Sequence, residues 1–182
     1  MTAVPLKTIV EGLLFVADEP LSLERLAQAF EEPPPPGVLK GALDELLVEY
    51  EELDRAFVLR PVAGGFQFRT RTELSSHVLR LKKKNPARLS RAALDTLAII
   101  AYCQPVLKAE VEKSRGVETG GLIRTLLEKD LIRVVGRREL PGRPLLYGTT
   151  RRFLETFGLP SLEALPTLAE IESLGLSPAG LF

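Results

Sequence analysis

The sequence has few of the residues from which enzymes usually build a reactive centre. Its 182 residues include one cysteine and one histidine, and no tryptophan. The single cysteine, Cys103, excludes an internal disulfide and is typical of a protein from a reducing compartment. With His77 as the one histidine, the chain also cannot assemble a His/Cys zinc site, which needs about four ligands.

Long apolar runs are missing as well. No stretch reaches the roughly 18 uncharged apolar residues that a membrane-spanning helix needs, and the N-terminus lacks the basic start and apolar core of a secretory signal. The apolar share of 45% is normal for a globular protein with a buried core. We therefore expect a cytoplasmic protein of one domain or two small ones, with no membrane partner.

Motifs of catalysis are absent too. Neither G-x-G-x-x-G nor G-x-x-x-x-G-K-[ST] occurs, which removes the two commonest phosphate-binding loops. His77 lies beside Ser75 and Ser76, but neighbours one and two apart point to different sides of a helix. The acidic residues between 49 and 54 lack the spacing of a calcium loop. We therefore predict no catalytic residue, no metal, no cofactor and no small-molecule substrate.

What the sequence does have is a marked separation of charge. The 24 basic and 24 acidic side chains cancel overall. Residues 1–56 have 4 basic and 12 acidic side chains, whereas residues 57–91 have 9 basic and 1 acidic. Residues 131–152 are again basic, with 6 basic side chains and 1 acidic one. Such blocks are either solvated faces of different elements or surfaces that steer a partner and guide dimer assembly.

Apolar periodicity predicts helices in the first part of the chain. Residues 6–17 and 38–53 have apolar side chains at helical spacing, and Ser22 is suited to cap a short helix between them. Pro20 ends the first helix because proline disfavours helical geometry in the preceding residue. The four prolines at 33–36 predict a stiff polyproline connection.

A hairpin and a linker follow. Two β-type runs at 57–62 and 66–70 flank a Gly-rich turn, Ala63-Gly64-Gly65, which is typical of a hairpin. We expect a short helix near 73–81 and a linker at 82–86. From residue 90 the same order returns, with helices, then strands, predicted at 90–103, 108–114, 119–130, 131–135 and 145–147.

This order is an internal repeat. A shift of 85 residues aligns Leu14 with Ile99, Pro20 with Pro105, Leu21 with Val106 and Leu26 with Val111. An offset of 80 aligns Leu43, Leu46 and Leu47 with Ile123, Leu126 and Leu127. Three helices followed by a hairpin describe a winged-helix domain, a variant of helix-turn-helix. The absence of alternating strands and helices argues against a Rossmann-type sheet.

We therefore predict a mainly α fold with small β-hairpin wings, organised as two tandem winged-helix domains. The N-terminal domain, residues 1–84, is assigned to dimerisation, and the C-terminal domain, residues 85–160, to partner binding. Residues 161–182 form a flexible C-terminal tail, whose last part, about residues 167–182, is expected to be ordered only on a partner or not at all.

Winged-helix domains often bind DNA, so the charge of the third helices matters. A recognition helix must bring Lys and Arg near phosphates, but residues 37–54 have a net charge of −5 and residues 118–130 a net charge of −1. We do not expect these helices to read sequence. The basic hairpins and linker leave a weak, non-specific DNA contact open, and a winged-helix DNA-binding transcriptional regulator is the alternative function.

Apolar side chains off the main stripes indicate protein contacts. Phe15 and Val16 lie off the stripe of the first helix, and Phe66 and Phe68 share one face of a strand. Each pair belongs either to the core or to a dimer interface. All four residues are our candidates for the dimer interface. The helix at 92–102 is apolar almost all round, so it is either the buried centre of its domain or covered in part by another chain.

Three motifs after residue 88 resemble one protein family. The runs LSRAALDTLAIIAYCQPV (89–106), Arg115-Gly116-Val117 and GRPLLYGTTRRFLETFGLPSLEALP (142–166) are similar to segregation and condensation protein B, ScpB. The resemblance extends over essentially the whole chain. It implies two winged-helix domains per subunit, a homodimer formed largely through the N-terminal domains, and no catalytic activity.

The resemblance also implies a biological role. Members are accessory subunits of the bacterial condensin complex and bind the kleisin ScpA. ScpA in turn bridges the heads of the structural-maintenance-of-chromosomes ATPase, which places the protein at the nucleoid in chromosome compaction and partition before cell division. Two departures stand out: Leu107-Lys108 replaces the usual Thr-Arg pair, so a bidentate arginine is lost, and the proline run at 33–36 is peculiar to this chain.

Within the second domain, polar and apolar residues are candidates for contact with the kleisin. We name them for their place in the resembling motifs, in the wing or on the apolar helix: Ile99, Tyr102, Lys108, Arg115, Arg137, Arg143 and Tyr147. The alternative for most of these residues is that they simply build the domain. Kleisin side chains would be buried in a helix-in-groove or strand-like manner, with specificity from charges at the rim.

Overall fold

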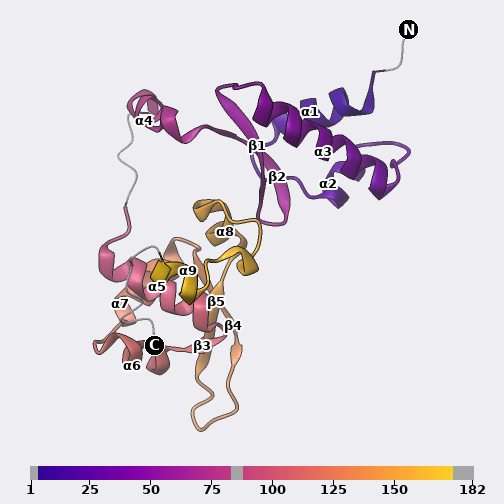
Figure 1. Ribbon diagram of the computed structural model, residues 1–182. Helices are drawn as coiled ribbons and strands as arrows, with labels where there is room; N and C mark the ends of the chain where they lie inside the picture. The colour runs from indigo at the N-terminus through magenta and orange to yellow at the C-terminus, as the bar shows by residue number, and fades with distance from the viewer. Residues whose placement is uncertain (1–3, 83–87, 174–182) are drawn as a thin grey trace. The chain divides into compact units, whose positions relative to one another are not determined.

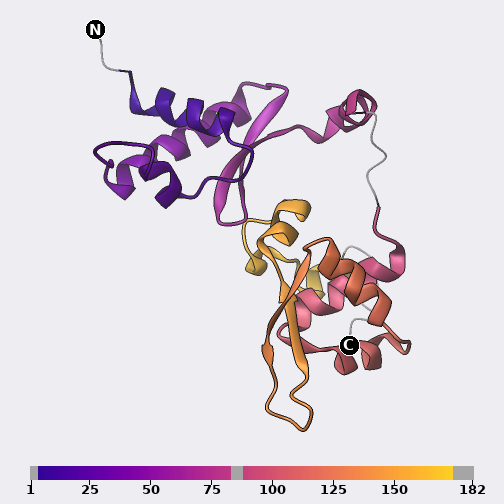
Figure 2. The same ribbon diagram turned by 180° about the vertical axis from the view of Figure 1, so that it is seen from behind.

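A computed structural model describes residues 4–82 and 88–173 of the chain (Figures 1 and 2). The chain divides into two compact units. The first unit comprises the residues up to Pro86 together with Gly158–Ser161, and the second comprises Ala87–Phe157 and the residues from Leu162 on. Both units are mostly helical with a small antiparallel sheet, in the winged-helix order that the sequence predicts. The predicted boundary at 84/85 and most of the predicted linker lie outside the described residues.

Helices come first in the first unit. They are α1 (Leu6–Val16), α2 (Leu23–Ala27) and α3 (Pro36–Glu52), followed by β1 (Phe57–Val62), β2 (Gly65–Thr70), a 3-10 turn η1 (Thr72–Leu74) and α4 (Ser75–Lys82). The hydroxyl of Ser22 caps α2 by accepting a hydrogen bond from Arg25 N at 3.3 Å. Pro36 occupies the first turn of α3, where the missing N–H of proline costs nothing. The helix therefore begins inside the predicted polyproline connection.

The hairpin of the first unit has a third partner that the sequence did not reveal. Leu21 and Phe66 exchange two backbone hydrogen bonds, of 3.0 and 2.8 Å, so the chain before α2 adds a short bridge to β2. A Cβ at Gly65 would lie 2.7 Å from the backbone carbonyl group of Leu21. This close approach explains why glycine begins β2.

The core of the first unit lies between α1, α2, α3 and β1. Its buried members are Val10, Leu14, Leu26, Leu39, Leu43, Leu46 and Leu59. The side chains follow the predicted apolar stripes, because residues three and four apart share one side of a helix. The rings of Tyr50, Phe57 and Phe68 extend the core, with centroids 4.7 to 5.5 Å apart.

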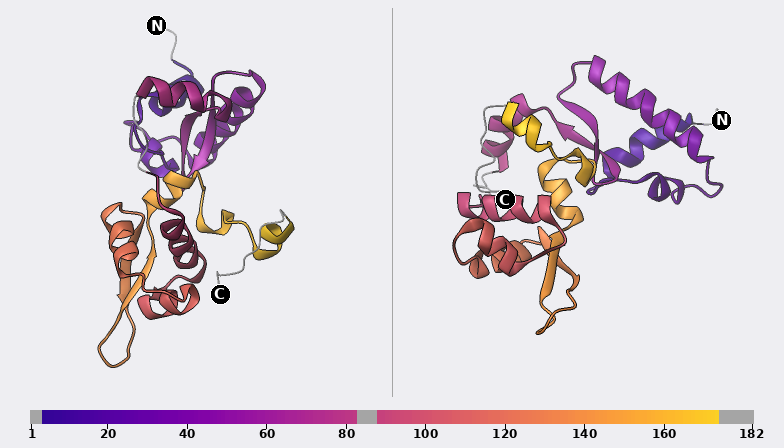
Figure 3. Two further views of the ribbon diagram at one scale, coloured as in Figure 1. Left: turned by 90° about the vertical axis from the view of Figure 1, so that its left-hand side faces the viewer. Right: turned by 60° about the horizontal axis from the view of Figure 1, so that its bottom comes forward.

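The second unit repeats this order with a larger sheet. Its elements are α5 (Arg91–Cys103), β3 (Val106–Leu107), α6 (Lys108–Arg115), α7 (Gly120–Glu128), β4 (Ile132–Arg137), β5 (Leu145–Thr149), α8 (Arg151–Phe157), η2 (Leu162–Ala164) and α9 (Leu168–Ser173). The strand order is β3-β5-β4, so β4 is an edge. The β4–β5 hairpin forms a wing that extends beyond the helices of its unit (Figures 1 and 3).

Burial agrees with the predicted repeat. Leu26 and its counterpart Val111 are both fully buried, as are Leu46 and Leu126. The bridge of Leu21 to the hairpin also corresponds to β3, whose Val106 pairs with Tyr147 of β5. The two units therefore bury equivalent positions of one winged-helix plan.

The last part of the chain differs from the predicted domain ends. Gly158, at φ 67°, ends α8, and the next residues return to the first unit. There Ala63 N and Gly64 N each donate a hydrogen bond of 2.8 Å, to Leu159 O and Pro160 O. The predicted tail also contains ordered elements, since η2 and α9 lie within it, whereas residues 174–182 fall outside the described structure.

Candidate protein-interaction surfaces

The outer side of α1 is an exposed, uncharged surface. Opposite its buried residues, the helix presents Thr8, Gly12, Phe15 and Val16. Thr8, Gly12 and Val16 follow at intervals of four and Phe15 lies three after Gly12, so together they form one broad stripe. Phe15 is 74% exposed and Val16 is 73% exposed. A Cβ at Gly12 would meet no atom within 4 Å, so nothing in the described structure covers the middle of this stripe. We call these four residues the α1 face.

The other dimer candidates lie elsewhere. Phe66 and Phe68 are partly buried and pack against the core of the first unit. The ring of Phe68 also packs at an angle against the ring of Tyr50 and edge-to-face against that of Phe57. Of the two readings of this strand face, the structure favours the core, so Phe66 and Phe68 leave the set of proposed interface residues.

A shallow groove runs along α3 beside the start of α1. It has a volume of about 530 Å³ and is lined by Lys7, Gly41, Asp44, Glu45, Val48, Glu49 and Glu52, which we call the α3 groove. Lys7 Nζ lies 2.9 Å from Glu49 and 3.8 Å from Glu45. The hydrogen bond to Glu49 raises the pKa of Lys7. One cation therefore balances only part of this acidic surface.

Two kleisin candidates in the second unit belong to its core. Ile99 is 1% exposed within α5, and Tyr147 of β5 is also buried, between Val106 and Val134 in the sheet. Helix α5 contacts α6, α7 and β5, so the reading that it is the buried centre of its unit holds. The prediction that Ile99 and Tyr147 contact a partner is not compatible with this burial.

Tyr102 and Lys108 are more accessible but already have contacts. The hydroxyl of Tyr102 donates a 2.7 Å hydrogen bond to Pro166 O, which ties the segment after η2 to α5. Partial burial raises the pKa of Tyr102. Lys108 is exposed, with Nζ 3.4 Å from Glu112 Oε1. Both side chains present part of their surface to solvent.

Arg115 connects two helices rather than facing solvent. Its side chain is 18% exposed, and Nη1 lies 2.8 Å from Asp95 Oδ2 on α5. The Nε atom of Arg115 is buried without a hydrogen-bond partner in the described residues. A partner would reach little of this guanidinium, so its position indicates a structural role.

The wing presents its arginines to solvent. Arg137 and Arg143 are exposed, and Arg137 Nη1 donates a 3.2 Å hydrogen bond to Arg143 O across the hairpin. Arg143 has φ 42° beside Gly142, which shapes the turn as the sequence suggested. Directly after β4, Arg138 forms an ion pair with Glu110 of α6. The hydrogen bond from Leu107 N, and then that from Arg138, lower the pKa of Glu110.

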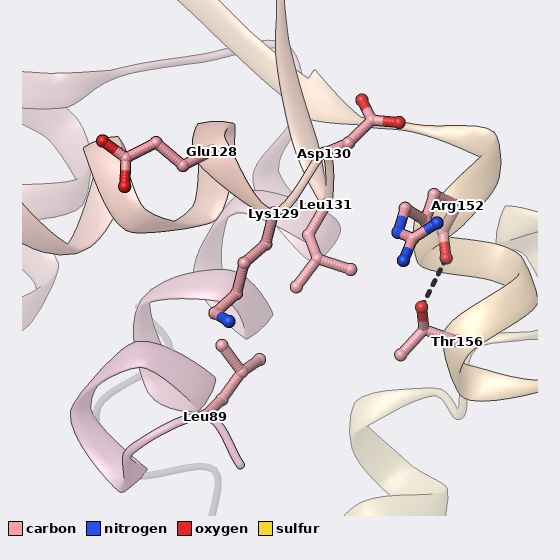
Figure 4. Close-up of a pocket in the computed structure, with 7 residues that line it drawn as sticks. All are labelled: Leu89, Glu128, Lys129, Asp130, Leu131, Arg152 and Thr156. Carbon is pink, nitrogen blue, oxygen red and sulfur yellow. Dashed lines mark hydrogen bonds between the residues drawn. The ribbon is translucent and has the colours of Figure 1, made fainter. Parts of the chain in front are cut away.

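A hollow of about 380 Å³ lies between the end of α7 and the start of α8 (Figure 4). It is lined by Leu89, Glu128, Lys129, Asp130, Leu131, Arg152 and Thr156. Leu131 and the Lys129 side chain point toward Leu89, whereas the carboxylates of Glu128 and Asp130 point away. The hollow thus combines two apolar side chains with charges of both signs.

The third helices do not present a basic surface of the kind that reads DNA. The exposed side chains of α3 include Asp44, Glu45 and Glu52, and the exposed Arg124 of α7 is paired with Glu128 at 2.9 Å. Within residues 4–82 and 88–173, no group of three His, Cys, Asp or Glu side chains is arranged to hold a metal ion. Nor does any helix in those ranges have the length and apolar character to cross a membrane.

Known proteins match this chain along most of its length. Residues 8–168 match the family described as segregation and condensation complex subunit ScpB. Segregation and condensation protein B of Syntrophotalea carbinolica is 52% identical over 174 residues, which are 96% of this chain and 87% of the relative. The protein of that name from Moorella thermoacetica is 47% identical over 170 residues, 91% of this chain and 84% of the relative.

Solved structures match as well. The crystal structure of ScpB from Mycobacterium tuberculosis is 36% identical, with a TM-score of 0.40, and the match covers 85% of this chain and 95% of that one. A crystal structure of the dimer of an ScpB N-terminal domain complexed with an ScpA peptide is 32% identical, with a TM-score of 0.38. It covers 42% of this chain and 94% of that chain.

The matched region runs from α1 to the start of α9 and contains the three motifs at 89–106, 115–117 and 142–166. In the structure these motifs form α5, the end of α6 and the segment from the wing turn through α8 to η2. Sequence identity near one half over almost the whole chain agrees with the tandem winged-helix fold, and this chain belongs to the family of segregation and condensation complex subunit ScpB.

Proposed function

We propose that this chain is a non-enzymatic scaffold subunit of a condensin-like complex. It binds the kleisin ScpA and, through the kleisin, acts with the structural-maintenance-of-chromosomes ATPase in chromosome condensation and partition during cell division. Its place is in the cytoplasm at the nucleoid. Family membership supports this role, and one observation carries it: the exposed α1 face is apolar and uncharged, whereas the third helices carry acidic groups.

The α1 face supports a homodimer. Phe15 and Val16 are each exposed by nearly three quarters of their surface, and full burial of such a side chain stabilises by about 1.5 to 3 kcal/mol. A two-fold axis uses the same patch on both copies, so each side chain is buried twice per dimer. Gly12, in the middle of the stripe, lets two helices approach closely there.

For the kleisin we propose the edge strand β4 together with the wing. The strand order leaves one side of β4 unpaired, and its Val134 and Val135 are exposed. An extended peptide adds readily to such an edge by main-chain hydrogen bonds, with side-chain contacts giving specificity. Arg137 and Arg143 then lie at the rim, where they would favour an acidic kleisin segment.

The same wing supports a secondary contact with DNA. Arg133, Arg137 and Arg143 are exposed there, and none of the three forms an ion pair with another described residue. Phosphate contacts of this kind are not sequence-specific and weaken steeply with salt. The acidic surface of α3 disfavours the alternative of a DNA-binding transcriptional regulator.

Calorimetric titration of the whole chain with ScpA tests the main proposal. At about 0.3 M NaCl we expect stoichiometric binding to ScpA, while binding to random duplex DNA fades. Val134→Asp should weaken ScpA binding by at least about tenfold, because it places a charge in the apolar part of the edge. Val134→Thr, which nearly keeps the volume of the side chain and adds no charge, is the matched control for the fold of the wing. Tight, selective binding of one DNA sequence without any binding to ScpA would contradict the proposal.

A further inference from the structure

Helix α4 in the first unit has apolar side chains in solvent. None of its 8 residues is buried in the described structure. Leu81 is 84% exposed, the highest value among the large apolar side chains described. Val78 and Leu81 are three positions apart and lie on one side of the helix. In Figures 1 and 2, α4 stands apart from α1, α2 and α3 of its own unit.

Two cations flank the exposed Leu81. Arg80 and Lys82 are both exposed, and neither has an ion pair or side-chain hydrogen bond with any other residue in the described ranges. The helix therefore presents a leucine between two positive charges that no described residue neutralises. A surface of this kind fits a partner that offers an apolar wall with carboxylates beside it.

The α3 groove offers that combination. Val48 is exposed along it, and a Cβ at Gly41 would meet no atom within 4 Å, so the groove is open to another chain. Asp44 and Glu52 line it without an ion pair to any residue of the described part of the chain. They are eight positions apart on α3, about 12 Å along the helix axis at 1.5 Å per residue.

Charge along the sequence favours a second copy as the occupant. Residues 1–56, which contain the α3 groove, have a net charge of −8, and residues 57–91, which contain α4, have a net charge of +8. Two copies attract each other when the acidic block of one faces the basic block of the other, whereas two acidic blocks repel. In a two-fold dimer the contact forms twice, which doubles its effect.

We propose that α4 of one copy docks in the α3 groove of a second copy. Leu81 packs against Val48, and the two cations of α4 lie beside the carboxylates of Asp44 and Glu52. This inference rests on the dimer of the proposed function and identifies which further surfaces complete it. The α1 face supplies the apolar part of the dimer, and the α4 contact fixes the orientation of the two copies.

Sedimentation equilibrium of the full chain, measured as a dilution series, tests the contact. The double variant Arg80→Glu/Lys82→Glu should raise the dimer dissociation constant by about tenfold or more, since each lost or reversed ion pair contributes modestly and the contact forms twice. Asp44→Lys/Glu52→Lys should have a similar effect. The decisive variant combines all four substitutions in one chain, because it swaps the charges of both surfaces and should restore most of the affinity.

Matched controls separate this contact from general charge. Arg88→Glu/Arg91→Glu changes the charge of the same basic block by the same amount outside α4, and should leave the dissociation constant within about twofold of wild type. Leu81→Ala should weaken the dimer without any change of charge.

The outcomes distinguish this inference from the proposed dimer. If Phe15→Asp breaks the dimer but reversal of the α4 charges does not weaken it, the docking of α4 is wrong and the dimer through α1 stands. If the variant with all four substitutions dimerises no more tightly than either double variant, α4 and the α3 groove do not meet in the dimer. If reversal of α4 abolishes only DNA binding, α4 holds phosphate instead. A wild-type chain that is monomeric at all concentrations would refute both the dimer and the docking.

Discussion

The first helix of each unit occupies the same place in the winged-helix plan, but its outer side meets opposite surroundings. The shift of 85 residues that aligns the units places Phe15 on Ile100 and Val16 on Ala101. Ile100 is fully buried and Ala101 is buried, whereas Phe15 and Val16 are largely exposed. In the second unit the central helix is surrounded by α6, α7 and β5, while the main contacts of α1 are with α3 and β2.

The difference indicates that the second unit completes its core within the chain and the first does not. Apolar side chains at equivalent positions are kept in both units, although in the first they are largely exposed. An exposed apolar patch of this kind is typical of an interaction site. This contrast supports the proposed dimerisation through the first unit and the proposed use of the β4 edge and the wing in the second.

The two units should differ most in their response to an aspartate placed at the aligned positions Phe15 and Ile100. Ile100→Asp buries a charge in the core and should cost more than about 4 kcal/mol, enough to unfold the second unit. Phe15→Asp should leave helicity unchanged and raise the dimer dissociation constant by at least about thirtyfold. Circular dichroism and sedimentation equilibrium measure the two effects. Loss of helicity in Phe15→Asp would show that α1 is covered within its own chain.

Equivalent core leucines should behave alike. Leu46 and Leu126 are aligned and both are almost completely buried, so Leu46→Ala and Leu126→Ala should each lower the free energy of unfolding by about 2 to 5 kcal/mol. Urea denaturation followed by circular dichroism measures the loss. A cost well under 1 kcal/mol for either variant would break the equivalence of the two cores.

A polar pair in the second unit stands where the first unit has apolar side chains. The shift aligns Asp95 with Val10 and Arg115 with Phe30, which contribute to the core of the first unit. Arg115→Met keeps most of the side-chain volume and removes the 2.8 Å pair with Asp95. We expect a loss of about 1 kcal/mol in the free energy of unfolding, because Asp95 is partly exposed and can be hydrated. Asp95→Asn is the control, and an unchanged stability in both would exclude a structural role for the pair.

The smallest effect concerns how each unit caps its second helix. The hydroxyl of Ser22 caps α2, but the aligned Leu107 has no such group, and the carboxylate of Glu110 accepts a 2.8 Å hydrogen bond from Leu107 N instead. This bond lowers the pKa of Glu110 from its usual 4.5. A carboxylate whose pKa is lower in the folded protein than in the unfolded chain stabilises the fold fully at pH values above its unfolded pKa. That stabilisation is lost as the pH falls through its folded pKa.

Glu110→Gln should therefore reduce the free energy of unfolding by about 0.5 to 1 kcal/mol at pH 7. The difference from wild type should shrink as the pH falls below the usual pKa of a glutamate, and urea denaturation at a series of pH values measures it. Ser90→Ala, which removes the hydroxyl that caps α5 by accepting a hydrogen bond from Ala93 N, should show a loss that does not change over the same range. A constant deficit for Glu110→Gln would mean that the carboxylate charge is not what stabilises α6.

Local patterns in the sequence predicted the elements of both units. Apolar residues at helical spacing located α1, α3, α5 and α7, and the Gly-rich turns located both hairpins, because these signals act within a few residues. The cap of α2 by Ser22 was also predictable, since the hydroxyl bonds to a backbone N–H three residues away. The family resemblance rested on longer motifs and is confirmed by the comparisons.

Features that depend on distant partners were not predictable in this way. The two residues of β3 are too few to show a strand pattern in the sequence. They form a strand because Val106 pairs with Tyr147 of β5. The return of residues 159 and 160 to the turn of the first hairpin depends on backbone hydrogen bonds, which no side-chain pattern reports. The roles of Phe68 and Ile99 required knowing which side of each element is covered, and that is decided by packing across the unit.

The most direct test of the account is the mass of the particle that the chain forms with ScpA, measured by light scattering at about 0.3 M NaCl. One chain has a mass of 20.0 kDa. The account predicts a complex that contains ScpA and two copies of this chain, and that loses one copy with Phe15→Asp. Separate elution of ScpA and of single chains at 20.0 kDa would contradict it.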